Sequence, residues 1–259
     1  MLRRIFLALF LPFLLTACRH EAANQLNVGM ELAYPPFEMT NEAGKPAGVS
    51  VDLAQALGEF LHRPVVIQNI PFDGLIPSLK TGKIDLVISS MTATPERAES
   101  IDFSEPYLTT GLALLTNAKA GVQSIEDLNQ AGKTVVVKKG TTGHVYAREH
   151  LPLPKVLVLE QESACVLEVA QGKADAFLYD QMSTLKNWRQ NPETTKPLLQ
   201  AFRTEGWAIG IRKGNDELRG QVNGFLKEFR EKKGFEKLGD LWLKEDKEAF
   251  KQRGIPFVF

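Results

Sequence analysis

The chain has 259 residues, enough for one large domain or for two compact lobes with separate cores. Apolar residues make up 44% and charged residues 24%, a globular composition that excludes a disordered chain. Lys and Arg number 31, as do Asp and Glu, so no net charge attracts nucleic acid or anionic lipid. Removing residues 1–17, which contain Arg3 and Arg4, would leave 29 basic against 31 acidic residues, which further disfavours a nucleic-acid partner.

The first residues have the pattern of an export signal. A basic start is followed by an apolar run over residues 5–15, which is too short for a helix that spans a hydrocarbon core of about 30 Å. Residues 15–18 (Leu-Thr-Ala-Cys) resemble the bacterial lipoprotein processing box. We therefore expect a signal peptide over 1–17, a lipidated Cys18 and a polar tether over 18–25, with the lipid as membrane anchor. The alternative is an ordinary signal peptide cut elsewhere, in which Cys18 has no special role.

With Cys18 lipidated, Cys165 has no disulfide partner and is expected in the core.

Beyond the tether, strand patterns alternate with helix patterns, which predicts an α/β fold with mainly parallel sheets flanked by helices. The expected strands cover residues 26–30, 65–69, 84–89, 134–137, 156–159, 174–178 and 207–211. The expected helices cover residues 50–62, 74–81, a segment from Pro95, a segment from about 124, then 142–150, 163–171 and a charged helical tail over 217–253.

One short pattern occurs twice. Residues 82–90 and 172–180 each begin with Gly-Lys-x-Asp and continue as an apolar strand that ends in polar residues. In open α/β sheets, ligands bind beyond the carboxyl ends of the strands. The repeat therefore predicts two similar sheets, each with polar groups at a ligand site, although helix–Gly–strand is also common in α/β proteins without such a meaning.

Arg97 occupies an unusual position. Thr94 and Pro95 have the pattern of an N-cap and a first helical residue, which places Arg97 in the first turn. The helix dipole disfavours a cation there by about 0.3–1 kcal/mol. A bound carboxylate would offset this cost, because the arginine fork and the free helix N–H groups both suit an anion. The alternatives are a solvated arginine or one paired with Glu96 or Glu99.

Other candidates follow the ends of predicted strands. Asp180 could bind an ammonium group or could simply cap the next helix, and residues 140–143 (Gly-Thr-Thr-Gly) could present N–H groups to an anion. Tyr34 and Phe72 could clamp a ligand side chain or belong to the core. Glu31 could line a site or lie on the surface. The four histidines lack ligand spacing and no nucleophile motif occurs, so we expect no metal and no cofactor.

These motifs follow one another as in a known family. The chain resembles the polar amino-acid-binding proteins of ABC importers, a family that includes the glutamine-, histidine- and lysine/arginine/ornithine-binding proteins. The segments that carry the resemblance are residues 33–38, 48–53, 72–79, 85–97, 101–107, 140–142 and 172–180. The resemblance implies a two-lobed periplasmic-binding-protein fold with a two-strand hinge. It implies lobe 1 over 26–109 and 206–259, lobe 2 over 114–202, and a hinge over 110–113 and 203–205.

The resemblance also implies how the common part of an amino acid would bind. Arg97 is expected to take the α-carboxylate in a two-pronged pairing, helped by backbone and hydroxyl groups of Thr92 and Thr142. Asp180 is expected to hold the α-ammonium group, with the backbone carbonyl of Ser90.

For the ligand side chain, the resemblance implies the contact residues but leaves several amino acids possible. Tyr34 and Phe72 are expected to sandwich it, and Glu31 and Ser89 to line its far end. A carboxylate beside two aromatic rings suits a cation, which favours arginine or lysine, with glutamine also possible. Ser50 stands where many relatives have an aspartate, and we expect this to alter local capping.

The resemblance implies a monomeric binding protein, not an enzyme, that delivers an amino acid to an ABC permease. Two alternatives share the fold: a cyclohexadienyl dehydratase-like enzyme, and a ligand-sensing module that reports to another membrane protein.

Overall fold

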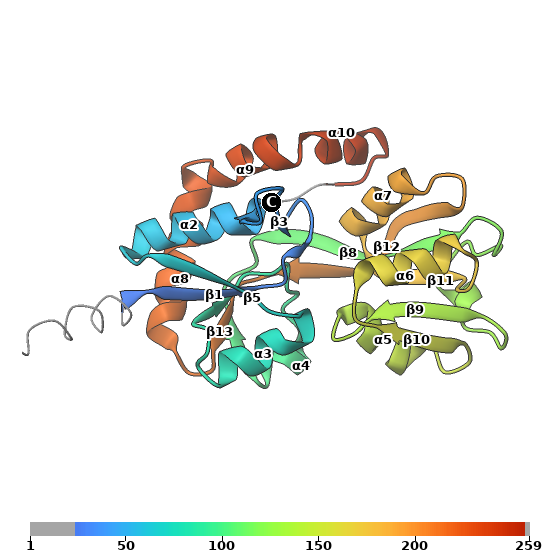
Figure 1. Ribbon diagram of the computed structural model, residues 1–259, viewed down its shortest axis with the longest axis horizontal. Helices are drawn as coiled ribbons and strands as arrows, with labels where there is room; N and C mark the ends of the chain where they lie inside the picture. The colour runs from blue at the N-terminus through green and yellow to red at the C-terminus, as the bar shows by residue number, and fades with distance from the viewer. Residues whose placement is uncertain (1–23, 257–259) are drawn as a thin grey trace, which may run out of the picture.

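The computed structural model describes residues 24–256, which form two lobes side by side (Figure 1). The predicted signal peptide and the lipidated Cys18 lie outside the described residues. Each lobe has a five-stranded sheet with helices on both faces, in agreement with the predicted fold class. None of the helices in the described part of the chain combines the length and hydrophobicity of a membrane span.

Lobe 1 is built on the sheet β5-β1-β6-β13-β7. Its strands are β1 (Leu26–Met30), β5 (Val65–Asn69), β6 (Leu86–Val87), β7 (Ile101–Phe103) and β13 (Gly210–Arg212). Its helices are α2 (Val49–Leu61), α3 (Phe72–Lys80), α4 (Pro95–Ala98), α8 (Asp216–Glu231), α9 (Gly234–Trp242) and α10 (Lys244–Gln252). A small sheet of β2 (Ala33–Tyr34), β3 (Glu38–Thr40) and β4 (Pro46–Ala47) follows β1.

Lobe 2 is built on the sheet β10-β9-β11-β8-β12. Its strands are β8 (Leu108–Asn117), β9 (Thr134–Lys138), β10 (Lys155–Leu159), β11 (Ala176–Asp180) and β12 (Thr195–Trp207). Its helices are the 3-10 turn η1 (Glu126–Leu128), α5 (Thr142–His150), α6 (Glu162–Ala170) and α7 (Gln181–Gln190). One strand in each lobe pairs in parallel with two neighbours: β1 with β5 and β6 in lobe 1, and β9 with β10 and β11 in lobe 2.

Two long antiparallel strands connect the lobes. β8 and β12 pair from Asn117 and Thr195 in lobe 2 to Leu108 and Trp207 at the edge of lobe 1. In Figure 1 they run as a ribbon from one lobe into the other. Trp207 also forms a bridge with Thr92 of lobe 1.

Central strands such as β1, β9 and β11 are buried on both faces, as parallel sheets under helices require, whereas the edge strands β5 and β10 are partly exposed. In β9, Val135 and Val137 pack toward α5, whereas Val136 packs toward α6. In β1, Gly29 leaves room for lobe 1 to pack, because a Cβ there would lie 2.4 Å from Ile84 Cδ1. Cys165 is buried and unpaired, as predicted.

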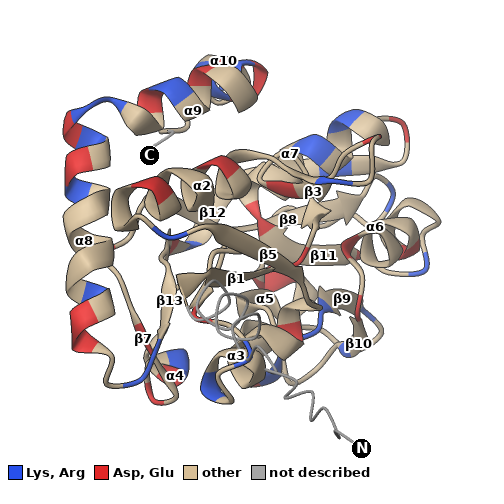
Figure 2. Cartoon of the chain, turned by 60° about the vertical axis from the view of Figure 1, so that its left-hand side comes forward, with Lys and Arg blue, Asp and Glu red and all other residues tan. Residues whose placement is uncertain are grey.

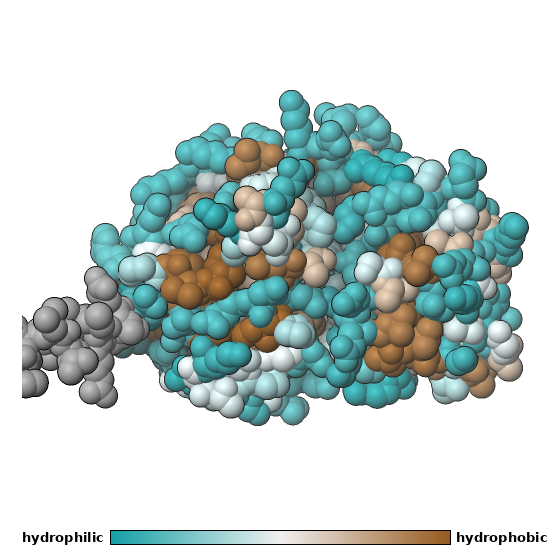
Figure 3. Space-filling model, viewed as in Figure 1, coloured by the Kyte–Doolittle hydropathy of each residue, from teal (hydrophilic) through white to brown (hydrophobic). Residues whose placement is uncertain are grey.

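The surface is mixed in character. Charges of both signs alternate along α8, α9 and α10, which cover one side of lobe 1 (Figure 2). On the face shown in Figure 3, most exposed side chains are hydrophilic, and hydrophobic ones gather in patches on each lobe.

Several predicted elements differ from the structure. The strand expected over 207–211 is interrupted, because the N–H groups of Ala208 and Ile209 bond to Met91 O and Ser104 Oγ instead of the sheet. The helix expected from 124 is only the turn η1, and the chain turns away at Gly132, where φ is +88°.

Further differences concern lengths. The strand expected over 84–89 is the shorter β6, Leu86–Val87. The tail divides into three helices, with a left-handed residue, Lys233, between α8 and α9.

Candidate functional site

A cavity lies between the lobes. All nine residues proposed from the sequence line it: Glu31, Tyr34, Phe72, Ser89, Ser90, Thr92, Arg97, Thr142 and Asp180. Six more residues complete the lining: Glu38, Leu112, Thr141, Tyr179, Glu205 and Trp207.

The topology explains why these residues meet. Glu31 follows β1, Ser89 and Ser90 follow β6, and Asp180 ends β11. These are carboxyl ends of parallel strands, where α/β sheets place ligands. Two such sheet edges, one in each lobe, face each other across the cavity.

Arg97 is held in place by backbone groups from both lobes. Its Nη1 donates to Thr92 O (2.7 Å) and its Nη2 donates to Gly140 O (2.9 Å), while the guanidinium carbon lies 5.4 Å from the centre of the Phe72 ring. Thr94 caps the short helix as predicted, since its side chain accepts from Arg97 N. Burial lowers the pKa of Arg97 to about 10, which still leaves it charged at neutral pH.

The alternatives for Arg97 do not describe this side chain. It is not a solvated surface arginine, and Glu96 forms its ion pair with Arg148 of lobe 2 (3.8 Å). Arg97 is thus a fixed cation at the cavity wall, with the planar fork that suits a carboxylate.

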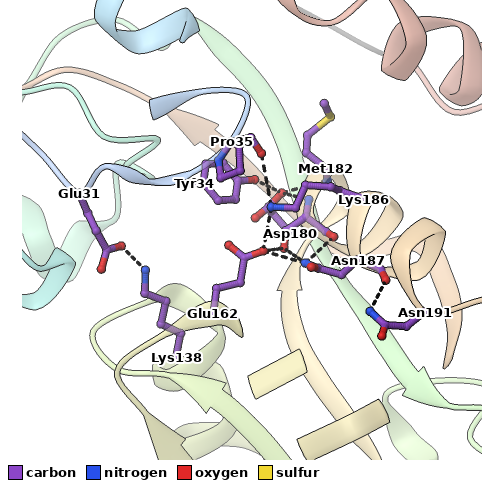
Figure 4. A network of polar contacts seen from close by, with 11 residues as sticks. Glu31, Tyr34, Pro35, Lys138, Glu162, Asp180, Met182, Lys186, Asn187 and Asn191 are labelled. Carbon is purple, nitrogen blue, oxygen red and sulfur yellow. Dashed lines mark hydrogen bonds and ion pairs between the residues drawn. The ribbon is translucent and has the colours of Figure 1, made fainter. Parts of the chain in front are cut away.

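Asp180 both caps a helix and lines the cavity. Its Oδ1 accepts hydrogen bonds from Met182 N (2.9 Å), Ser183 N (3.0 Å) and the Tyr34 hydroxyl of lobe 1 (2.6 Å) (Figure 4). Burial raises the pKa of Asp180 to about 6, and the Tyr34 hydrogen bond opposes this rise. Within residues 24–256 no hydrogen bond reaches its other oxygen, Oδ2. The helix-cap alternative is therefore correct, and it leaves one carboxylate oxygen for a donor.

Glu205 joins the two lobes at a point that sequence reasoning missed. It lies on β12, and its Oε2 accepts from the hydroxyls of Thr92 of lobe 1 and Thr142 of lobe 2, both at 3.0 Å. Burial raises its pKa. Its Oε1 has no hydrogen-bond partner in the described part of the chain.

Glu31 pairs with a buried cation that sequence reasoning also missed. Lys138 ends β9 in lobe 2, and its Nζ forms an ion pair with Oε2 of Glu31, a lobe 1 residue that lines the cavity (Figure 4). The side chain of Lys138 is only 3% exposed and that of Glu31 is 15% exposed. The Lys138 Nζ also lies 5.6 Å from the centre of the Phe72 ring.

Another buried carboxyl group, Glu38, lines the lobe 1 side of the cavity. It accepts hydrogen bonds from Ser50 (2.6 Å), Ser90 (3.1 Å) and Ser89 (3.4 Å), and burial raises its pKa to about 8. This contact corrects the expectation that Ser50 affects capping, because helix α2 is capped at Gly48 without a side-chain bond. Ser50 instead supports a residue of the cavity wall.

The cavity thus holds fixed opposite charges on opposite lobes, an arrangement suited to binding a small molecule that carries both charges. Arg97 belongs to lobe 1 and Asp180 to lobe 2, so one ligand can contact both only while the lobes are together.

Comparison with known proteins agrees with this arrangement. The sequence pattern of the bacterial extracellular solute-binding proteins, family 3, matches residues 26–245. The chain is 30% identical over 223 residues to the L-cystine-binding protein TcyJ of Escherichia coli, covering 85% of this chain and 83% of that protein. It is 30% identical over 238 residues to the L-arginine-binding protein of Pseudomonas aeruginosa, covering 87% and 90%.

Similar solved structures are also amino acid-binding proteins. An ancestral amino acid-binding protein, described as a precursor of cyclohexadienyl dehydratase, superimposes with a TM-score of 0.79 at 34% identity, covering 87% of this chain and 97% of that one. An ancestral arginine-binding protein bound to arginine superimposes with a TM-score of 0.78 at 35% identity, covering 85% and 98%.

Proposed function

Because the chain belongs to family 3 of the bacterial extracellular solute-binding proteins, we propose that it is the substrate-binding component of an amino-acid ABC importer. The observation that carries this proposal is the pair of opposite charges in one cavity, the half-buried Arg97 in lobe 1 and the buried Asp180 in lobe 2. Arg97 takes the ligand α-carboxylate, with the hydroxyl or backbone groups of Thr92 and Thr142. Asp180 takes the α-ammonium group through Oδ2, with the Ser90 carbonyl.

Capture would proceed by hinge closure. A ligand favours the closed state only through contacts that it makes with both lobes at once. Asp180 and Thr142 on lobe 2 supply such contacts to a ligand held by Arg97 on lobe 1. We assign the hinge to residues 110–113 and 203–205, between lobe 1 (26–109 and 206–259) and lobe 2 (114–202).

The side-chain end of the ligand is the finer part of the proposal. We assign Tyr34 and Phe72 to the two sides of the ligand side chain and Glu31 to its far end. All three residues line the cavity, and this set favours a polar or cationic amino acid such as arginine, lysine or glutamine. Relatives are named for L-cystine and for L-arginine, so both kinds of ligand occur among similar proteins. The ion pair between Glu31 and Lys138 weighs against a simple cation, because Glu31 already has a positive partner.

Delivery would occur at a membrane. We propose that Cys18 carries the lipid anchor and that the closed, monomeric protein docks on an ABC permease. Mass spectrometry of the mature N-terminus tests the anchor: a diacylglyceryl group on Cys18 is expected, and a mature chain that begins elsewhere would contradict it.

Calorimetry on the full chain in detergent micelles tests the binding function. At least one L-amino acid is expected to bind, and Arg97→Ala is expected to reduce its affinity by about 2–5 kcal/mol, roughly 30-fold or more. Arg148→Ala is the matched control, since Arg148 is an exposed arginine outside the cavity. Unchanged affinity in Arg97→Ala would overturn the assignment of the carboxylate site. Turnover of prephenate or arogenate by the same preparation would favour the dehydratase alternative.

A further inference from the structure

Lys138 places a buried positive charge next to Glu31, a residue that lines the cavity. It ends β9 in lobe 2, its side chain is almost fully buried, and its ionic partner is Glu31 of lobe 1. Figure 4 shows the two side chains reaching toward each other from opposite lobes, apart from the cluster around Asp180. The pair therefore forms a second oppositely charged couple beside the couple of Arg97 and Asp180.

A ligand that enters this part of the cavity must leave both members of the pair with partners. A lone cation, such as the end of arginine or lysine, would compete with Lys138 for Glu31 and leave a buried ammonium group beside another positive charge. A lone carboxylate, as in glutamate, would take Lys138 and leave Glu31 unpaired. An apolar end would leave the pair intact but would gain no ionic contact from either group.

We propose that the cavity selects a bis-amino acid, a ligand whose side chain ends in a second amino-acid head group. Glu31 binds the second ammonium group and Lys138 binds the second carboxylate, while Arg97 and Asp180 bind the first head group. This inference rests on the proposed function and names the ligand class of the same site.

The symmetry of the two lobes supports this assignment. The N–H of Asn27 in β1 donates to Asp85, and the N–H of Thr134 in β9 donates to Asp175, so Asn27 and Thr134 occupy equivalent positions. Glu31 lies four residues after Asn27, and Lys138 lies four residues after Thr134. The pair thus joins equivalent strand ends that carry opposite charges, one on each lobe, and a dipolar group between them contacts both lobes.

The neighbouring groups fit the same ligand class. Phe72 lies within 6 Å of both Arg97 and Lys138, so its ring can cover the stem that joins two head groups.

Calorimetry on the full chain in detergent tests the proposal with five probes: L-cystine, L-cystathionine, L-arginine, L-glutamate and S-methyl-L-cysteine. We expect the first two to bind at least tenfold more tightly than the others. S-methyl-L-cysteine keeps one head group and a sulfur-containing stem, so its weak binding would isolate the contribution of the second head group.

Variants of the pair should change the ranking of the probes, which a merely structural role would not do. Lys138→Met is expected to weaken L-cystathionine at least tenfold and to strengthen L-arginine, because Glu31 is then unpaired. Glu31→Gln, the second variant, is expected to weaken L-cystathionine and to strengthen L-glutamate. Lys139→Met removes the adjacent lysine, which pairs with Asp73 outside the cavity, and should leave the ranking unchanged.

The possible failures are distinguishable. Tighter binding of L-arginine, L-glutamate or S-methyl-L-cysteine than of the two bis-amino acids in the unmodified chain would overturn this inference and leave the proposed function standing. An unchanged ranking in both pair variants would also overturn it. Failure to bind any amino acid would overturn the proposed function itself.

Discussion

Lobes 1 and 2 share one arrangement of three parallel strands and differ in the groups at the strand ends. The order β5-β1-β6 in lobe 1 corresponds to β10-β9-β11 in lobe 2. In each lobe an aspartate after a Gly-Lys turn holds the middle one of these three strands, β1 or β9: Asp85 accepts from Asn27 N at 2.8 Å and Asp175 accepts from Thr134 N at 2.7 Å. The repeated sequence pattern thus marks a repeated structural contact, far from the cavity.

At the opposite ends of these strands the lobes diverge. β11 runs directly into α7, so Asp180 becomes a helix cap with a carboxylate at the cavity. The equivalent residue, Ser90, has a left-handed φ of 46° and directs the chain toward Thr92 and Arg97 instead. The shared framework fixes where the ligand groups lie, and the divergent ends decide which charge each lobe presents.

Among variants at the equivalent strand ends of the two lobes, Asp180→Asn should cause the largest loss of ligand affinity. The amide keeps an oxygen for the Tyr34 hydroxyl and for the N–H groups of α7, so the fold is retained. Loss of the negative charge leaves the ligand ammonium without its ionic partner and should weaken binding by about 2–5 kcal/mol. Calorimetry measures this loss.

Ser90→Ala is the matched change in lobe 1. The backbone carbonyl assigned to the ligand is kept, and only the hydrogen bond from Ser90 Oγ to Glu38 is lost. Affinity should change much less than in Asp180→Asn. Equal losses in the two variants would contradict the assignment of the ammonium partner to Asp180.

The aspartates at the other strand ends should affect stability and not affinity. Asp85→Ala and Asp175→Ala each remove a carboxylate that accepts from a strand N–H, at a cost of about 1–3 kcal/mol in the free energy of unfolding. Thermal denaturation measures the loss. Weakened ligand binding in the folded variants would show that these two contacts affect ligand affinity as well as the stability of the sheets.

Much of the fold followed from local sequence patterns. Runs such as the β-branched residues of β9 and the Gly-Lys turns predict elements of a parallel sheet directly. The long strands β8 and β12 were predicted only as a hinge, through the resemblance, because their burial depends on partners far along the chain. The break at Ala208 and Ile209 depends on Met91 and Ser104, and no local pattern contains those contacts.

Some cavity residues could likewise be predicted from local sequence patterns, whereas others depend on partners far along the chain. Arg97 and Asp180 stand at recognisable helix starts, so their positions drew attention in the sequence. Lys138 ends a strand and precedes another lysine, and nothing local distinguishes the buried Lys138 from the exposed Lys139. Glu205 gains its role from Thr92 and Thr142, which reach it from separate lobes.

Binding should weaken in acid because of Asp180. Its pKa of about 6 in the ligand-free cavity means that the carboxylate is lost as the pH falls through this value. Affinity should therefore fall roughly tenfold from about pH 7 to about pH 5, where the ligand head group keeps its own charges. Calorimetry at several pH values measures this, and a flat profile would contradict an ionised Asp180 as the ammonium partner.

The stability of the ligand-free protein should change in the opposite direction. A carboxyl group whose pKa is raised by folding takes up a proton in the folded state before it does so in the unfolded chain. Its contribution therefore makes the folded state more stable as the pH falls from about 6 toward its ordinary value of 3.8. The difference in Tm between the unmodified chain and Asp180→Asn should show this trend.

The smallest effect is expected at the rim of the cavity. Lys139 of lobe 2 pairs with Asp73 of lobe 1 at 2.8 Å, but both side chains are substantially exposed, so solvent and salt screen the pair. Lys139→Met should change the affinity for every amino acid only slightly and to the same degree, and added salt should have the same effect. The adjacent Lys138, buried and facing Glu31, should instead distinguish one ligand from another. A large, ligand-dependent loss in Lys139→Met would show that recognition extends to the rim, and would remove the distinction between the two lysines on which the ligand class rests.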